Sequence, residues 1–194
     1  MKRFISLAIT VFASAFLYAQ TSSGTWNSRT ATYTNTTHKI TWKLDDELTW
    51  VGRPILAEST LFKVRNDDTH ILIKLGATKG DATDADAWEY ISVYNSPQYQ
   101  DMYKAQAKQN GMTFLGTKVS KSQLCGIHAA KVRSDMKKYY PEHKQTVHSI
   151  EIMYQVCRHG YVYTASVTAL SVLEEEIELF DRIATDLFKG LNIE

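Results

Sequence analysis

Six histidines are the side chains best suited to metal or acid–base chemistry: His38, His70, His128, His143, His148 and His159. A metal site needs two or more of them to converge with a carboxylate, and neither His-Glu-x-x-His nor another diagnostic ligand spacing occurs. Asp81, Asp84 and Asp86 resemble a calcium loop, but Ala85 and Trp88 break its alternating pattern and its glycine is absent. We therefore expect acids at a helix start, histidines at strand ends, and no metal or other cofactor.

Nucleophilic catalysis has no motif in this chain. A Gly-x-Ser-x-Gly elbow and a glycine-rich phosphate loop are both missing, and no serine or cysteine has a base identifiable by spacing. One enzymatic alternative stays open: a small hydrolase-like or metal-dependent enzyme whose site is built from scattered histidines and carboxylates, around His128 and His159. A non-catalytic binding protein is favoured over that alternative.

Aromatic side chains gather in residues 88–103. Tyr90 and Tyr94 are four positions apart, as are Tyr99 and Tyr103, so each pair lies on one face of a predicted helix. Such a face can form a groove for a glycan or a peptide. More often it packs in a core with its hydroxyls at the rim, and we favour packing here.

Tyr139 and Tyr140 differ from these tyrosines because they stand beside Pro141 at a predicted loop between two strands. Loops are where binding residues tend to lie. We therefore expect Tyr139 and Tyr140 to form a contact patch for a partner.

The last third of the chain predicts the elements that would position these residues. Alternation of apolar and polar residues indicates strands, and an apolar stripe at helical spacing, with Ile183 and Phe188 widening it, indicates a helix. The predicted strands span residues 127–138, 146–158 and 161–169, and the helix spans 172–189. The second strand is apolar on both faces, which indicates a sheet covered on each side. Gly190 is placed to cap the helix.

Earlier segments predict further strands and two helices. The strands are expected at residues 29–33, 37–43, 60–65, 70–75 and 112–120. The helices are expected at 83–94 and 96–109, the second with Ser96 as its N-cap and Pro97 in its first turn. This succession is typical of the α+β class with a central antiparallel sheet.

Cys125 and Cys157 stand near the ends of the first two of the closing strands. If the hairpin turns at residues 141–142, the residue numbers of two positions that pair across it add up to about 283. The residue numbers of the two cysteines add up to 282. We therefore expect a disulfide between them. The alternatives are buried reduced neighbours and, less favoured without a Cys-x-x-Cys spacing, a redox pair.

The N-terminus predicts a secretory signal peptide. Lys2 and Arg3 precede an apolar run at residues 4–17, and cleavage is expected after Ala19, with Ala15 as an earlier site. A membrane anchor is the competing interpretation, but this run is shorter than the roughly 20 residues that a spanning helix needs.

We accordingly divide the chain into a signal peptide at 1–19 and one domain at 20–194, with 20–28 as a loose leader. Removing the signal lowers the net charge from +1 to −1 because Lys2 and Arg3 leave without an acid. A near-neutral surface argues against nucleic acid as a partner. We expect a periplasmic or secreted protein with no membrane span after signal removal.

Several stretches together resemble the end of the PsbP-like fold: residues 125–132 (CGIHAAKV), 150–154 (IEIMY), 160–167 (GYVYTASV), 180–183 (FDRI) and Phe188. That family includes the photosystem subunit PsbP, the Ran-binding nuclear import factor and small exported bacterial proteins of unassigned role. The resemblance spans roughly residues 39–193. It implies an α/β/α sandwich, with a central antiparallel sheet flanked by helices, and a protein that works by binding an unknown protein or small ligand in the cell envelope. It carries no catalytic motif, so no functional residue is transferred.

Overall fold

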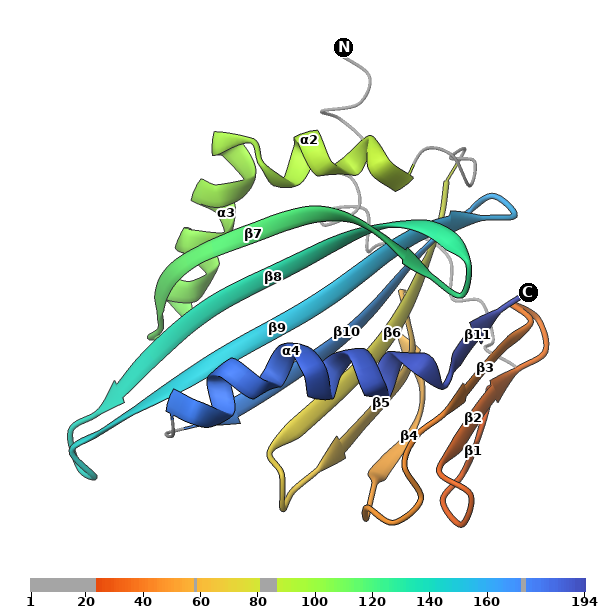
Figure 1. Cartoon of the computed structure of the whole chain (residues 1–194), viewed down its shortest axis with the longest axis horizontal. Coiled ribbons are helices and arrows are strands. Elements are labelled where there is room, and N and C mark those ends of the chain that lie inside the picture. The colour runs from red at the N-terminus through yellow and green to blue at the C-terminus, as the bar shows by residue number, and fades with distance from the viewer. Residues whose placement is uncertain (1–23, 58, 81–86, 172–173) are drawn as a thin grey trace.

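The computed structural model describes residues 24–57, 59–80, 87–171 and 174–194 (Figure 1). The predicted signal peptide and the start of the first predicted helix, at 83–86, lie outside these residues. In chain order the elements are β1 (Gly24–Asn27), β2 (Thr32–Asn35), β3 (Ile40–Lys43), β4 (Val51–Ala57), β5 (Thr60–Asn66), β6 (Ile71–Lys79), α2 (Tyr90–Tyr94), α3 (Pro97–Gln109), β7 (Thr113–Leu124), β8 (Ile127–Tyr140), β9 (Gln145–Arg158), β10 (Tyr161–Ser171), α4 (Glu174–Lys189) and β11 (Leu191–Ile193).

Two antiparallel sheets are formed. The larger sheet has seven strands in the order β4-β5-β6-β10-β9-β8-β7, and the smaller has four in the order β1-β2-β3-β11. In the larger sheet β10 lies between β9 and β6, which joins the C-terminal strands to the earlier β4–β6 meander. The predicted antiparallel α+β class is therefore observed.

Side-chain alternation gives the large sheet two different faces. On β9, Ile152 and Val156 point to what we call the inner face, where α4 and the small sheet pack. Met153 and Cys157 point to the outer face, beneath the segment that contains α2 and α3. Both faces of β9 are buried, as its two-sided apolar pattern predicted.

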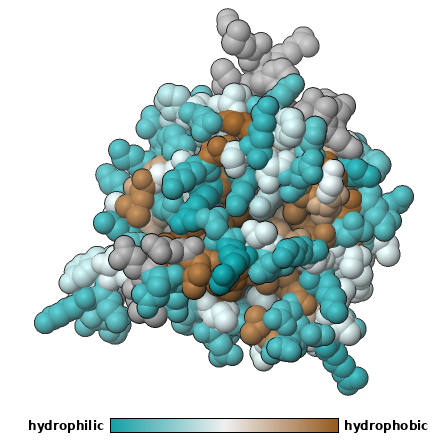
Figure 2. Space-filling view, in the orientation of Figure 1, coloured by the Kyte–Doolittle hydropathy of each residue, from teal (hydrophilic) through white to brown (hydrophobic). Residues whose placement is uncertain are grey.

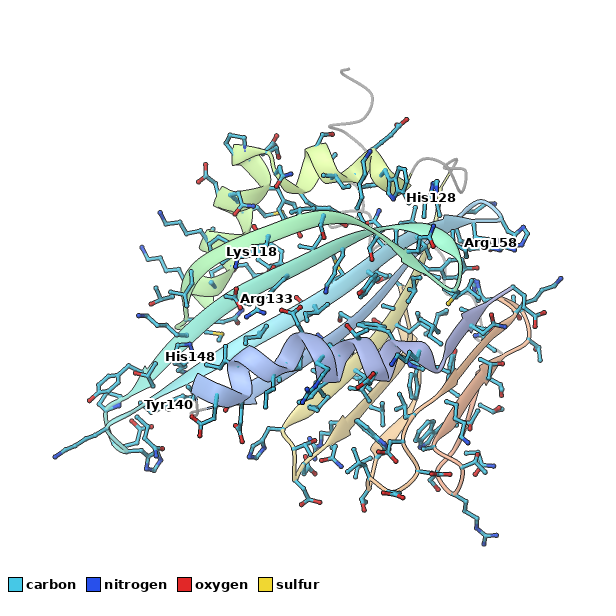
Figure 3. The ribbon with its side chains drawn as sticks, in the orientation of Figure 1. Lys118, His128, Arg133, Tyr140, His148 and Arg158 are labelled. Atoms are coloured by element: carbon cyan, nitrogen blue, oxygen red, sulfur yellow. The ribbon has the colours of Figure 1, made fainter. Side chains whose placement is uncertain are left out.

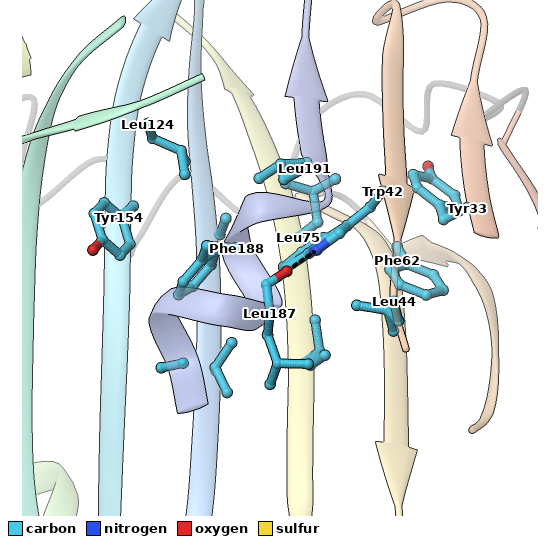
Figure 4. Close-up of a cluster of buried hydrophobic side chains, with 14 of the residues drawn as sticks. Tyr33, Trp42, Leu44, Phe62, Leu75, Leu124, Tyr154, Leu187, Phe188 and Leu191 are labelled. Carbon is cyan, nitrogen blue, oxygen red and sulfur yellow. Dashed lines mark hydrogen bonds between the residues drawn. The ribbon is translucent and has the colours of Figure 1, made fainter. Parts of the chain in front are cut away.

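The main core fills the space between the inner face, α4 and the small sheet (Figure 4). Trp42 of β3 is fully buried, stacks on Phe188 with ring centroids 5.7 Å apart, and donates its indole N–H to the Leu187 carbonyl at 2.9 Å. Fully burying a large apolar side chain stabilises a fold by about 1.5–3 kcal/mol. Since the indole is also hydrogen-bonded, Trp42 anchors the end of α4 to the small sheet without leaving a polar atom unpaired.

The outer face is covered by the segment that contains α2 and α3, and its clusters of buried side chains are smaller than the main core. The helix α3 begins as predicted, with Pro97 in its first turn and the Ser96 hydroxyl accepting from the Tyr99 amide. Together α2 and α3 lie over β7 and β8 in Figure 1. Tyr94 and Tyr99 pack there against Val132 and Met153.

Several elements differ from the sequence-based expectation. A second sheet shares the inner face with α4, so the layers are not simply those of an α/β/α sandwich. β1 falls within the segment 20–28 that was expected to be a loose leader, because Trp26 packs against Phe62 and β1 pairs with β2. The strand β4 was not among the strands expected from the sequence, although it contains Gly52 and Pro54. It is an edge strand of the large sheet, where proline is tolerated.

Candidate functional site

The predicted contact residues Tyr139 and Tyr140 end strand β8. Register pairs Tyr139 with Thr146 and Tyr140 with Gln145, so the connecting turn is Pro141 to Lys144. The tip of this hairpin extends beyond α3 and α4 in Figure 1. The Tyr139 side chain is 58% exposed, the largest value among the exposed large apolar and aromatic residues of the described chain.

The two tyrosines project from opposite faces of the β8–β9 ribbon, because they are successive residues of one strand. Tyr140 is half-buried, and the Lys138 ammonium lies over its ring, 4.8 Å from the ring centroid. On the other face, Lys137 pairs with His148, next to the pair formed by Tyr139. The tip therefore presents an aromatic ring with lysine beside it on each side.

The six histidines do not converge. Figure 3 shows Tyr140 and His148 near the hairpin tip, at the opposite end of the sheet from His128 and Arg158. His70 and His159 occupy turns with positive φ, and His143 is exposed in the β8–β9 turn. Within the described residues, no three His, Cys, Asp or Glu side chains come close enough to hold a metal ion.

His128 stacks on Trp88 instead of meeting His159. The two ring centroids are 3.7 Å apart, and the Lys121 ammonium lies 4.6 Å from the Trp88 ring. The Trp88 indole donates to the Ser122 carbonyl at 3.3 Å. These contacts hold the segment before α2 against strands β7 and β8. His128 therefore has a packing role.

His38 is the buried histidine. It lies edge-on to the rings of Tyr161 and Tyr163, with Nδ1 3.2 Å from the Tyr163 hydroxyl. Burial lowers the pKa of His38, because removing the ring from water disfavours the charged form and so favours the neutral imidazole. Burial also raises the pKa of Tyr163, to about 12. Sequence spacing could not have found this cluster, because His38 and Tyr163 are 125 residues apart.

The tyrosines of α2 and α3 turn inward. Tyr94 donates to the Gln155 side chain and Tyr103 donates to Glu151 Oε2 at 3.2 Å. The Tyr99 hydroxyl is buried and has no hydrogen-bond partner among the described residues. Burial is the main cause that raises the pKa of all three phenols. Packing, rather than an open aromatic groove, is therefore confirmed.

Four charged side chains join β8 to α4. Asp181 of α4 accepts from Lys131 at 3.2 Å and also pairs with Arg133, which in turn pairs with Asp135 at 3.1 Å. Partial burial acts to raise the pKa of Asp181, but the hydrogen bonds and charges of Lys131 and Arg133 outweigh it and the pKa is lowered. These carboxylates are engaged in ion pairs that hold the helix on the sheet.

The expected disulfide between Cys125 and Cys157 is wrong, because neither cysteine forms a disulfide. Paired positions across β8 and β9 sum to 285, as in Tyr140 with Gln145, not to about 283. That register leaves the cysteines on opposite faces of the sheet. Cys157 packs with Ala87 on the outer face, whereas the Cys125 thiol donates to the Leu191 carbonyl at 2.9 Å. Burial raises the pKa of Cys125, which disfavours a reactive thiolate.

No helix in the described part of the chain is both long and apolar enough to cross a bilayer. No protein-family model matches the sequence, and no curated protein matches it.

Solved structures do resemble it. They include LpqN, described as involved in cell envelope biogenesis of Mycobacterium tuberculosis, at 14% identity and a TM-score of 0.44, with 80% of this chain and 83% of that chain covered. A protein of Bacteroides thetaiotaomicron VPI-5482 has 11% identity and a TM-score of 0.45, with coverage of 80% and 45%. Cyanobacterial PsbP from Synechocystis sp. PCC 6803 has 9% identity and a TM-score of 0.47, with coverage of 90% and 98%.

Identities this low transfer no functional residue to this chain. The chain is similar to solved structures that include a PsbP, and the PsbP-like family is the one that its sequence resembles.

Proposed function

We propose that the protein is an exported, non-catalytic binding protein of the cell envelope, and that the tip of its β8–β9 hairpin makes the contact. The observation that carries this proposal is the position of Tyr139, a 58% exposed aromatic residue at the end of a projecting hairpin. Large exposed aromatic side chains are over-represented where proteins bind partners. The sequence-predicted signal peptide and the envelope role printed for LpqN support the compartment.

Three of the other chemistry-bearing groups support binding over catalysis because packing and ion pairs already account for them. His128 is stacked on Trp88, His38 is enclosed by tyrosine rings, and Asp181 holds the α4 helix to the sheet. A general base or a nucleophile needs a free position beside its substrate. At the hairpin tip, by contrast, the Tyr139 ring faces outward.

Affinity capture from gently cross-linked envelopes tests the proposal. The exported chain, residues 20–194, is compared with the double variant Tyr139→Ala/Tyr140→Ala. Val51→Ala is the control, because Val51 is 52% exposed and lies on β4, at the opposite edge of the seven-stranded sheet from β8. We expect an envelope component that the tyrosine variant loses and the control retains. Equal recovery by all three proteins would contradict the proposal.

A further inference from the structure

We propose that the tip of the β8–β9 hairpin, residues 137–148, docks on a membrane surface that contains anionic lipid. This inference rests on the proposed function, since it assigns a partner class to the same tip. It differs from that function in naming a lipid surface, not a protein, as the partner. Three properties of the tip carry it: its charge, the placement of its two tyrosines and its projection from the domain.

The charge of the tip is opposite in sign to that of the rest of the chain. Lys137, Lys138 and Lys144 outweigh Glu142, which gives residues 137–148 a net charge of +2 with histidines neutral. The exported chain carries −1, so the remainder carries −3. A basic tip on an acidic body orients itself toward an anionic surface. In the space-filling view the tip is a hydrophilic projection (Figure 2).

The lysines are placed where a surface can reach them. Lys137 and Lys144 are exposed, as are Pro141, Glu142 and His143 of the turn. No ion pair involves Lys137 or Lys144 among the described contacts, whereas Lys131 and Arg133, lower on the same strand, are both paired with Asp181. The positive charge that remains available on this ribbon is therefore concentrated at its tip.

The two tyrosines favour a bilayer over a protein partner. Tyr139 and Tyr140 project from opposite faces of the ribbon, so one flat protein surface laid against either face would contact only one of them. A tip that enters a headgroup layer end-on is surrounded on all sides, so both rings make contact at once. Tyrosine suits that layer because its ring is apolar and its hydroxyl is polar.

The geometry around Tyr140 fits the same arrangement. The Lys138 ammonium lies 4.8 Å from the Tyr140 ring centroid, which keeps a positive charge at the level of an aromatic ring. In a headgroup layer, lipid phosphates lie beside such a lysine while the ring contacts the upper acyl region. The tip is thus built to lie on the surface, and it contains no segment long enough to span the bilayer.

Vesicle co-sedimentation tests the inference. Residues 20–194 are mixed with vesicles of zwitterionic phosphatidylcholine alone, or with about one third phosphatidylglycerol, in low salt and in about 0.5 M salt, where the Debye length falls to a few ångströms. We expect partition only into the anionic vesicles and its loss in high salt. Since each lysine near an anionic surface strengthens binding several-fold, Lys137→Gln/Lys144→Gln should weaken partition about 30-fold.

The matched control removes the same charge elsewhere. Lys43 on β3 and Lys63 on β5 are exposed on strands far from the tip, and Lys43→Gln/Lys63→Gln leaves the same net charge as the tip variant. We expect the control to weaken partition less than about threefold. An equal loss in both double variants, or no preference of the exported chain for anionic vesicles, would overturn the inference. If vesicles fail to bind while a tyrosine-dependent envelope protein is still captured, the proposed function stands and the lipid partner is wrong.

Discussion

Replacing Gly190 by alanine should destabilise the domain sharply. A Cβ at this position would lie 1.8 Å from the Lys43 carbonyl oxygen, and real Cβ contacts are essentially never shorter than 3.0 Å. The backbone of α4 and β3 must therefore separate by roughly 1.2 Å. That movement breaks the hydrogen bond from the Lys43 amide to the Gly190 carbonyl, now 2.9 Å, and loosens the packing of Trp42 on Phe188.

The magnitude follows from two contributions. Overpacking costs about 1–3 kcal/mol, and a lost backbone hydrogen bond costs about 1 kcal/mol. We expect Gly190→Ala to lower the free energy of unfolding by about 3 kcal/mol, which is a fall in Tm of roughly 6–12 °C for a domain of this size. Urea unfolding followed by tryptophan fluorescence measures it, since Trp42 reports on this contact.

Gly126→Ala is the control for backbone strain without a clash. Gly126 has φ +75°, a conformation that disfavours alanine, but nothing lies within 4 Å of its built Cβ. We expect a cost of about 1–2 kcal/mol there. If Gly190→Ala costs no more than Gly126→Ala, the close approach of α4 to β3 is wrong.

Three further predictions concern the interior. Tyr103→Phe should cost about 1 kcal/mol because Glu151 loses its donor, whereas Tyr99→Phe should be neutral or stabilising because its hydroxyl has no partner; urea unfolding distinguishes the two, and equal costs would contradict the assigned hydrogen bonds. The pKa of His38 is lowered in the fold, so the unfolded chain binds its proton more readily and stability is lost as pH falls below the ordinary value of 6.5. Thermal unfolding from pH 7.5 to 5 should therefore show a decline that His38→Gln reduces; an unchanged decline would place the loss elsewhere. Finally, alkylation in denaturant without a reductant should label both cysteines, and a mass without two labels would restore the disulfide.

Local pattern predicted the closing strands well because each buries a regular face. Register could not be read with the same accuracy. The residue numbers of paired positions sum to 285, which differs by three from the 282 of Cys125 and Cys157, and an odd difference places the two side chains on opposite faces. An approximate register sum was therefore too coarse to predict a covalent bond, since one residue decides the face.

Two further differences between the sequence-based expectation and the structure concern α4 and the residue that follows it, and both depend on long-range packing. Gly190 was predicted as a helix cap, but its φ is not in the left-handed region and the approach of Lys43 explains it instead. Ile183 was expected to widen the buried stripe of α4, yet its side chain is 39% exposed. Neither difference is encoded in the spacing of neighbouring residues.

The candidate site was located in part. Tyr139 and Tyr140 were expected in the loop and instead form the last two positions of β8, next to the turn that Pro141 begins. Their opposite orientations and the lysines beside them became clear only from register. Whether they bind a partner remains a prediction.

Site-specific photo-cross-linking in the intact envelope tests the central claim most directly. A photoreactive residue replaces Tyr139, and in a control protein it replaces Val51, which is 52% exposed on the edge strand β4. The hairpin account predicts a reproducible adduct with an envelope component from position 139 and little or none from position 51. No adduct at 139, or the same adducts from both positions, would contradict it.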